Sequence, residues 1–373
     1  MLGPWISALL LTAPCPERSV WPSPDWPEAI ADTAEAEAKD IAALEDYAFT
    51  LTGADADRAG IRTDAVLILR GGRLVYERYA RGWDRSQKHL AWSVSKSVTA
   101  TLVGAAVAQG ILGVKDSICQ VSPRASTHCE VSIDHLLEFA SGLDWKEVYE
   151  NESNQASSVL AMLYGEGHAD WARFVLGHAK KYEPGSYFAY STGDSTLLLS
   201  VLNPAAEAKL GRDWPWTLLF DRIGLSSAVF ERDARGNIAG GSYFYATARD
   251  YLRLGYLYLG DGCWSGQRIL PEDWVARSTT ISEALYATPT EALKPGDIQG
   301  RQWWINRAVP RKGLARAWKS APEDTYVAIG HWGQYVIVVP SHDFVAVRLG
   351  DDRDDTFDLD TFIRLALAIG EAP

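Results

Sequence analysis

AWSVSKSVTA, residues 91–100, continues to Gly110 as TLVGAAVAQG. Apolar residues recur here at a spacing of four: Val94, Val98, Leu102 and Ala106. This pattern predicts a helix that is buried on most of its circumference. Ser93 lies where the helix begins, and Lys96 lies one turn further on over the same face. Burial lowers the pKa of a lysine, and a neutral lysine beside a serine hydroxyl can activate it as a nucleophile. The stretch therefore indicates a catalytic pair; the alternative is a capping serine with a solvated lysine.

The composition is that of a folded protein with an acidic surface. The chain has 373 residues, of which 47% are hydrophobic and 23% charged, so it can form one large catalytic unit or two domains. Its formal net charge of −12 argues against nucleic acid or anionic lipid as the natural partner. The 15 tryptophans and 16 tyrosines must largely pack in cores, but they also permit an aromatic-lined cleft.

Four cysteines are too few for a disulfide scaffold and lack metal-ligand spacing. Cys119 and Cys129 bracket a short loop of turn-forming residues, and we expect them to be bonded if the protein is exported. Two free thiols are the alternative in a reducing compartment. Cys15 and Cys263 have no evident partner.

The N-terminus bears on the compartment. Residues 5–11, WISALLL, resemble the end of a secretory signal, although no lysine or arginine precedes them. The run is also too short for a stable membrane span. We expect a periplasmic or secreted protein; a cytoplasmic one is the alternative if this segment is not a signal.

The order of expected elements indicates an α+β fold. Strands are expected at both ends of the chain, at 66–70, 73–79, 326–329, 335–339 and 344–348, the first two joined by a two-glycine turn. Helices are expected over 28–51, 132–140, 171–178, 195–209, 247–259 and about 356–369, with an irregular stretch over 143–167. One antiparallel sheet built from both termini and flanked by helices follows from this order. We expect three parts: 1–27, a leader-like segment and proline-rich linker; 28–115 plus 240–373, the sheet domain; and 116–239, an inserted, mainly helical subdomain.

Two further stretches carry candidate chemistry. Tyr190 can act as a general base if a cation such as Lys96 lowers its pKa; otherwise it is a packing residue. Residues 330–334, GHWGQ, enter an apolar strand, where glycine lets a substrate approach and a backbone N–H can donate to an oxyanion. His331 can bond substrate or Tyr190, or it is an ordinary loop histidine.

A third stretch is a decoy. Residues 193–196, GDST, resemble the nucleophile box of the Gly-Asp-Ser-Leu esterases, which place it near the start of the chain with a late Asp-x-x-His. That second motif is absent from this sequence. Ser195 is therefore expected to cap the helix that follows it.

Taken in chain order, Ser93-Val-Ser-Lys96, Tyr190-Ser-Thr192 and His331-Trp-Gly333 resemble the motifs of the penicillin-recognising serine hydrolases. The chain is similar to the class C β-lactamase-like superfamily and, within it, to the aminohexanoate-oligomer (nylon-oligomer) hydrolases and related esterases. The resemblance covers roughly residues 45–370. It is supported by SGLDW at 141–145, TARD at 247–250 and RQWW at 301–304.

The resemblance implies the β-lactamase/transpeptidase-like fold and a role for each matching residue. Ser93 matches the nucleophile, Lys96 its proton acceptor, and Tyr190 the residue that assists proton transfer to the leaving group. The backbone N–H groups of Ser93 and Gln334 match the oxyanion hole.

Thr192, His331, Trp332 and Gly333 match substrate-binding positions, with two departures. Thr192 stands where β-lactamases of this class usually have asparagine, which puts that contact to a substrate amide in doubt. His331-Trp-Gly333 replaces Lys-Thr-Gly, so the cation that holds a β-lactam carboxylate is missing.

We therefore expect a serine hydrolase that acts through an acyl-enzyme on carboxylic esters or small linear amides, with no metal or organic cofactor. A D-Ala-D-Ala carboxypeptidase or β-lactamase is one alternative. A non-catalytic ligand-binding or sensor protein of the same fold is another. The sequence indicates a small-molecule substrate but specifies neither its acyl group nor the oligomeric state of the protein.

Overall fold

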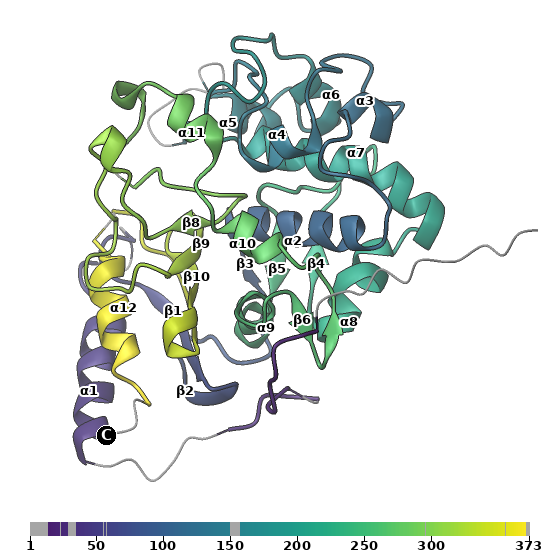
Figure 1. Ribbon diagram of the computed structural model, residues 1–373. Helices are drawn as coiled ribbons and strands as arrows, with labels where there is room; N and C mark the ends of the chain where they lie inside the picture. The colour runs from purple at the N-terminus through teal and green to yellow at the C-terminus, as the bar shows by residue number, and fades with distance from the viewer. Residues whose placement is uncertain are drawn as a thin grey trace, which may run out of the picture.

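A six-stranded antiparallel sheet with the strand order β2-β1-β11-β10-β9-β8 lies at the centre of the fold (Figure 1). The computed structural model describes residues 14–22, 24–28, 35–54, 56, 58–149, 157–294, 296–354 and 356–370. The strands are β1 (Thr63–Arg70), β2 (Arg73–Tyr79), β8 (Trp304–Ile305), β9 (Tyr326–Gly330), β10 (Gln334–Val339) and β11 (Phe344–Gly350). Strands from both termini thus share one sheet, which confirms the predicted fold class.

The β1–β2 hairpin forms where the two-glycine turn was expected. Gly71 and Gly72 have φ of 57° and 77°, the left-handed conformations that a tight hairpin turn needs at both central positions. Strand β1 is buried on both faces: Val66 and Ile68 pack into one hydrophobic cluster, and Leu67 into another. Because alternate side chains point to opposite faces, the sheet must be covered on both sides.

Helices provide that cover (Figure 1). Helices α1 (Glu35–Phe49) and α12 (Leu359–Leu367) lie together on one face, and α9 (Ala248–Leu259) lies on the other. A Cβ on Gly255 of α9 would lie 2.5 Å from Val345, so glycine lets this helix approach β11 closely. The helix expected from residue 28 begins at Glu35; residues 29–34 lie outside the described residues.

The part of the molecule beside the main sheet is mostly helical. Its elements are α2 (Val94–Ala108), α3 (Ile118–Val121), α4 (Ile133–Leu137), α5 (Ser158–Tyr164), α6 (Trp171–Leu176), α7 (Thr192–Leu210), α8 (Asp221–Ile223), α10 (Trp274–Ser278) and α11 (Glu283–Ala287). Two small sheets accompany them: β3 (His89–Leu90), β5 (Phe244–Ala246) and β4 (Val229–Phe230), and the pair β6 (Cys263–Trp264) and β7 (Gln267–Arg268). Helix α2 packs against both α7 and β9, so one hydrophobic core continues from the sheet into the helical half. The predicted domain boundaries stay a prediction.

Two local predictions are wrong. Residues 143–167 were expected to be irregular, but α5 lies within them, begun by Ser157, whose hydroxyl accepts from the Leu160 N–H at 3.2 Å. Helix α7 begins at Thr192, not after Ser195. Ser191 has the extended backbone of an N-cap and accepts from the Asp194 N–H at 2.9 Å. Ser195 instead lies inside the helix.

Both pairs of cysteines form disulfides. Cys119–Cys129 closes the loop as expected, and Cys15–Cys263 corrects the expectation that these two had no partner. The pairing could not be inferred from the sequence because the two cysteines are 248 residues apart. The N-terminal segment packs against α9, where Trp21 contacts Tyr256 at 5.3 Å between ring centroids, and this packing places Cys15 near Cys263. The leader-like residues 1–13 lie outside the described part of the chain. Among the described helices, none is both long and apolar enough to cross a membrane.

Loss of the long-range disulfide should destabilise the protein more than loss of the local one. The chain-entropy model gives about 5 kcal/mol for a loop of this length and about 3 kcal/mol for the Cys119–Cys129 loop. We expect Cys15→Ser/Cys263→Ser to lower the free energy of unfolding more than Cys119→Ser/Cys129→Ser, measured by urea denaturation. Intact mass before and after reduction checks that both bonds are present; an equal loss of stability in the two variants contradicts the expected dependence on loop length.

Candidate active site

Ser93 and Lys96 meet at the start of α2. Ser93 is the N-cap residue of this helix, yet its side chain makes no capping hydrogen bond. Instead Lys96 Nζ lies 2.9 Å from Ser93 Oγ. The residue before the serine, Trp92, has φ of 46°, a left-handed conformation that is strained for a bulky side chain and is common near functional sites. The structure therefore brings the predicted pair together with the serine hydroxyl available for chemistry.

Lys96 is buried with three hydrogen-bond acceptors. Besides Ser93 Oγ, its Nζ contacts Thr192 Oγ1 at 2.8 Å and the Gly241 carbonyl oxygen at 3.0 Å. Burial lowers the pKa of Lys96 to about 8, although the negative charge of Glu147 acts to raise it. A substantial fraction of this lysine is therefore neutral near physiological pH, as a proton acceptor must be.

Tyr190 lies against the same pair. Its ring centroid is 4.8 Å from Lys96 Nζ, and its hydroxyl interacts with the Ser93 side chain. Burial, assisted by the charge of Glu147, raises the pKa of Tyr190 well above its usual value. The idea that Lys96 lowers this pKa enough to make a phenolate base is therefore wrong: Tyr190 keeps its proton and can act as a donor that is reprotonated by its neighbours.

Glu147 is the important residue that the sequence did not reveal. Its carboxylate accepts from Thr192 Oγ1 at 2.5 Å, from the Thr192 N–H at 2.9 Å and from Tyr149 at 2.5 Å. Trp145 Nε1–H donates to it at 2.6 Å. A usable signal was present: residues 145, 147 and 149 alternate along a loop segment, so an extended backbone directs all three side chains to one side.

These bonds fix which way the Lys96 amine faces. The single hydroxyl proton of Thr192 is used by Glu147, so Thr192 Oγ1 can only accept from Lys96. The Gly241 carbonyl also can only accept. A neutral amine has two N–H groups, and these two acceptors take both. Its lone pair is then left for Ser93 Oγ, which is the arrangement that proton removal from the serine requires.

The predicted substrate-binding residues occupy different places. Thr192 is fully buried beside Lys96 rather than exposed to the cleft. His331 and Trp332 line the cleft as part of the turn between β9 and β10. The ring of His331 stacks on Tyr149 with centroids 5.0 Å apart.

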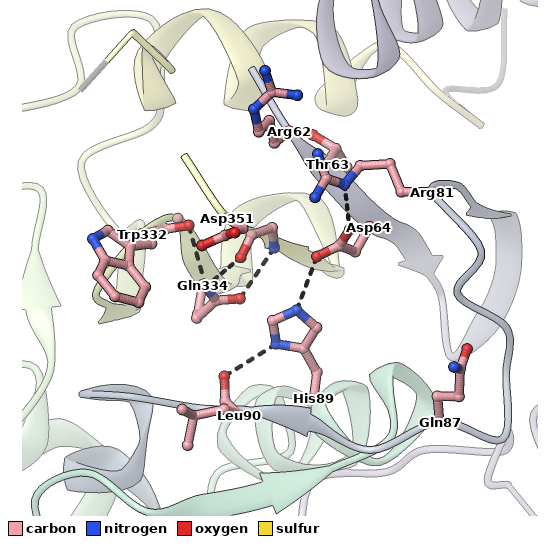
Figure 2. Close-up of polar contacts among 12 residues, drawn as sticks. Arg62, Thr63, Asp64, Arg81, Gln87, His89, Leu90, Trp332, Gln334 and Asp351 are labelled. Carbon is pink, nitrogen blue, oxygen red and sulfur yellow. Dashed lines mark hydrogen bonds and ion pairs between the residues drawn. The ribbon is translucent and has the colours of Figure 1, made fainter. Parts of the chain in front are cut away.

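Gly333 and Gln334 support this turn from behind. A Cβ on Gly333 would lie 2.0 Å from the guanidinium of the buried Arg348, which donates to the Gly333 carbonyl at 2.9 Å. The side-chain amide of Gln334 donates to the carbonyls of His331 and Trp332 and to that of Gly350, at 3.0, 3.2 and 2.7 Å (Figure 2). The turn therefore has a fixed shape.

A second polar network supports the segment that leads to Ser93 (Figure 2). The buried Asp64 on β1 accepts from Arg81 Nε at 2.9 Å, and His89 Nε2 lies 3.0 Å from its other oxygen. His89 Nδ1 is 3.1 Å from the Leu90 carbonyl. These contacts join β3 to the main sheet two residues before Trp92.

The backbone of Gly330 lies close to the segment that precedes the nucleophile. A Cβ there would lie 2.2 Å from the Ala91 carbonyl oxygen, so only glycine lets the end of β9 approach this closely. Gln334 is buried opposite Gly330 in the β9–β10 ladder and is not among the described residues that line the cleft. The assignment of its N–H to an oxyanion hole stays a prediction.

Ser93, Tyr190, His331 and Trp332 line one cleft of about 470 Å³. Aromatic rings form much of its wall, including Tyr149, Trp304 and Tyr335. Three carboxylates also line it, those of Glu147, Asp297 and Asp352, against one exposed cation, Lys294. A larger hollow of about 750 Å³ near Arg173 contains none of the three predicted catalytic residues, so volume alone does not identify the site.

The known proteins with related sequences and folds include hydrolases. The chain is 26% identical over 314 residues to 6-aminohexanoate-dimer hydrolase of Paenarthrobacter ureafaciens, covering 78% of this chain and 73% of that protein. Its fold is similar to that of EstCE1, a hydrolase with promiscuous acyltransferase activity, with a TM-score of 0.62 at 17% identity over 90% of this chain and 98% of that one. It is also similar to a class C β-lactamase from Rhodobacter sphaeroides, with a TM-score of 0.56 at 16% identity over 90% of this chain and 98% of that one.

The sequence and the fold therefore lead to the same relatives, as the motif resemblance predicted. The match to the family extends well beyond the motifs themselves: it covers residues 41–368, from within α1 to the end of α12. The chain belongs to the Beta-lactamase family.

Proposed function

We propose that the protein is a serine hydrolase that cleaves carboxylic esters or small linear amides through an acyl-enzyme. Neutral Lys96 accepts the Ser93 hydroxyl proton while Ser93 Oγ attacks the substrate carbonyl carbon. Tyr190 then donates its proton to the leaving oxygen or nitrogen and is reprotonated from Lys96. Water attacks the resulting acyl-serine, which releases the acid and restores Ser93.

One observation carries this proposal: Lys96 is buried, has a pKa of about 8 and lies 2.9 Å from Ser93 Oγ, with its other two acceptors already defined. Burial that lowers the pKa of a lysine also lowers the stability of the folded protein, so a lysine with a purely structural role has no use for it. A lysine that must be neutral to accept a proton, in contrast, depends on the lowered pKa for its function. The similarity to 6-aminohexanoate-dimer hydrolase supports the same chemistry, and the fold is shared with EstCE1, a hydrolase with promiscuous acyltransferase activity.

The charge of the cleft favours neutral or cationic substrates over β-lactams. A β-lactam has a carboxylate close to its scissile amide, and the cleft meets it with the carboxylates of Glu147 and Asp297. The third carboxylate, that of Asp352, is paired with the buried Arg348. His331 and Trp332 stand where a lysine and a threonine would hold that group. Lys294 is the one exposed cation among the described residues that line the cleft. This arrangement argues against the D-Ala-D-Ala carboxypeptidase and β-lactamase alternatives, whose substrates are anionic.

Hydrolysis of p-nitrophenyl acetate and butyrate should exceed that of nitrocefin by kcat/KM. Loss of a charge-assisted contact costs about 1.5–3 kcal/mol, which is roughly ten- to a hundredfold in transition-state binding. Steady-state rates on the three substrates at one pH provide the measurement, with Ser93→Ala protein as the blank. A higher kcat/KM on nitrocefin contradicts this interpretation of the His331–Gly333 turn.

We further propose that the protein works in an oxidising compartment, the periplasm or outside the cell. Two disulfides among four cysteines support this, because disulfides rarely persist in the cytosol. Fractionation of the native host, followed by detection of the protein with an antibody, tests it; a cytosolic location contradicts it.

A further inference from the structure

The outer face of the small sheet β3-β5-β4 has two aliphatic side chains and a tyrosine. Leu90, Tyr245 and Val229 stand directly opposite one another across the three strands, so their side chains share one face. The other face, with Phe230 and Phe244, is buried in the core. An antiparallel sheet with one solvated face normally carries polar residues there. Val229 is 37% exposed, and Leu90 and Tyr245 are half-buried, so part of this row reaches the surface.

Helices α5 and α6 turn this face into a groove. Tyr164, at the end of α5, is 58% exposed, and its ring centroid lies 6.4 Å from that of Tyr243. Trp171, at the start of α6, lies 6.3 Å from the same ring. Together with Tyr245 these rings line a groove of about 590 Å³. Polar and charged residues also line it: His168, Glu231, Arg232 and Asp233.

Trp92 connects this groove to the catalytic cleft. Its side chain lines the groove, with its ring centroid 6.3 Å from Tyr243, and it also contacts Trp332 of the cleft at 5.1 Å. Trp92 is bonded directly to Ser93 and adopts the strained φ of 46°. A series of ring contacts therefore leads from Trp332 of the cleft, through Trp92 and Tyr243, to the exposed Tyr164.

We propose that this aromatic groove, lined by Trp92, Tyr164, Trp171, Tyr243 and Tyr245, binds the apolar acyl chain of an ester substrate beyond its fourth carbon. The inference rests on the proposed function, because it assumes that the scissile carbonyl lies at Ser93. The acyl side is favoured over the alcohol side because Tyr190, the donor to the leaving group, packs elsewhere. Its ring contacts Phe139 at 4.9 Å and Trp304 at 5.7 Å. A leaving group directed to Tyr190 leaves the acyl chain on the side of Trp92.

The dependence of kcat/KM on chain length tests this. With p-nitrophenyl acetate, butyrate, hexanoate and octanoate, we expect kcat/KM to rise by about tenfold from butyrate to octanoate, since each further methylene is removed from water. Tyr164→Ala should lower the octanoate-to-butyrate ratio severalfold and leave the rate on acetate unchanged. Tyr164→Phe, which keeps the ring, should restore the ratio. Tyr187→Ala, which removes a surface ring that stacks on Tyr182 instead, is the matched control.

Two outcomes contradict the proposed role of the groove. One is a kcat/KM that does not change with chain length in the unmodified protein. The other is an equal fall in kcat/KM on acetate and on octanoate in Tyr164→Ala. A preference for octyl acetate over methyl octanoate overturns the acyl assignment.

Binding of p-nitrophenyl octanoate to Ser93→Ala protein, measured by calorimetry with and without Tyr164→Ala, separates this proposal from the function. Binding that strengthens with acyl-chain length, in a protein that does not hydrolyse esters, contradicts the proposed function but not the groove. Ser93-dependent hydrolysis without chain preference overturns the groove alone.

Discussion

Replacing Ser93 with alanine should lower kcat/KM on p-nitrophenyl acetate by about 10⁴-fold or more while leaving the fold intact. The other two serines of the motif cannot take over, because both are buried and engaged. Ser95 Oγ donates to the Ser242 carbonyl at 2.6 Å, and Ser97 Oγ donates to the Gln302 carbonyl at 2.7 Å. Ser93 also makes no capping bond to α2, so its loss removes no helix stabilisation. Initial rates with purified protein, beside a thermal melt, provide the measurement.

Ser97→Ala is the matched control, since it removes a hydroxyl from the same helix without touching Lys96. It should stay within severalfold of the unmodified rate. A fluorophosphonate probe should label the unmodified protein and Ser97→Ala but not Ser93→Ala. Correctly folded, unmodified protein that neither hydrolyses esters nor takes the label would instead favour the alternative of a non-catalytic binding protein.

The sheet was predictable because its signals are local. Strands β1, β10 and β11 are short apolar runs bounded by turn residues, and Gly71 and Gly72 predict the hairpin between β1 and β2. Helix α2 was predictable for a similar reason, since its small apolar residues leave it no exposed side. Helix α5 was missed, although the shorter helices α4 and α6 were predicted. Its seven residues follow a long aperiodic stretch and add too little periodicity of their own to indicate a helix.

The site was predictable only where spacing along one element determines geometry. Ser93 and Lys96 are three residues apart on a helix, so their contact follows from helical geometry alone. Glu147 reaches Thr192 from a loop 45 residues away, and nothing local in the sequence requires that contact. The direction of the Tyr190 pKa was also beyond the sequence, because it depends on burial among side chains from distant elements. The pairing of Cys15 with Cys263 belongs to the same class of long-range facts.

Glu147 gives the lysine two opposing properties. Its charge raises the pKa of Lys96 and so favours the inactive, protonated form. Through Thr192 it also fixes the acceptor that directs the amine lone pair to Ser93. Burial is the larger influence on the pKa, so the lysine remains titratable near pH 8 in spite of the carboxylate. Glu147 thus orients the Lys96 amine, while its charge moderately reduces the fraction of Lys96 that is neutral.

Replacing Lys96 with methionine should lower kcat/KM by about 10²–10⁴-fold, the range of a general base, and remove the pH dependence that the lysine imposes. In the unmodified protein only neutral Lys96 can accept the serine proton. Since its pKa is about 8, kcat/KM should rise with pH, about tenfold per unit well below pH 8, and become constant above it. Rates on p-nitrophenyl acetate from pH 5.5 to 9.5, corrected for spontaneous hydrolysis, provide the profile. An unmodified protein with no inflection between pH 7 and 9 contradicts the role of Lys96.

Glu147→Gln separates the two properties of the carboxylate within the same experiment. Removal of the negative charge lowers the pKa of Lys96, so the rise in kcat/KM should move to lower pH. The plateau at high pH should fall as well, because an amide cannot accept from all four donors that now meet the carboxylate. Lys181→Gln removes an exposed charge of the same magnitude that pairs with Asp144 outside the cleft, and it should change neither quantity. A lower plateau with an unmoved inflection would mean that Glu147 only supports the loop. A moved inflection with an unchanged plateau would mean that Thr192 orients the amine without its help.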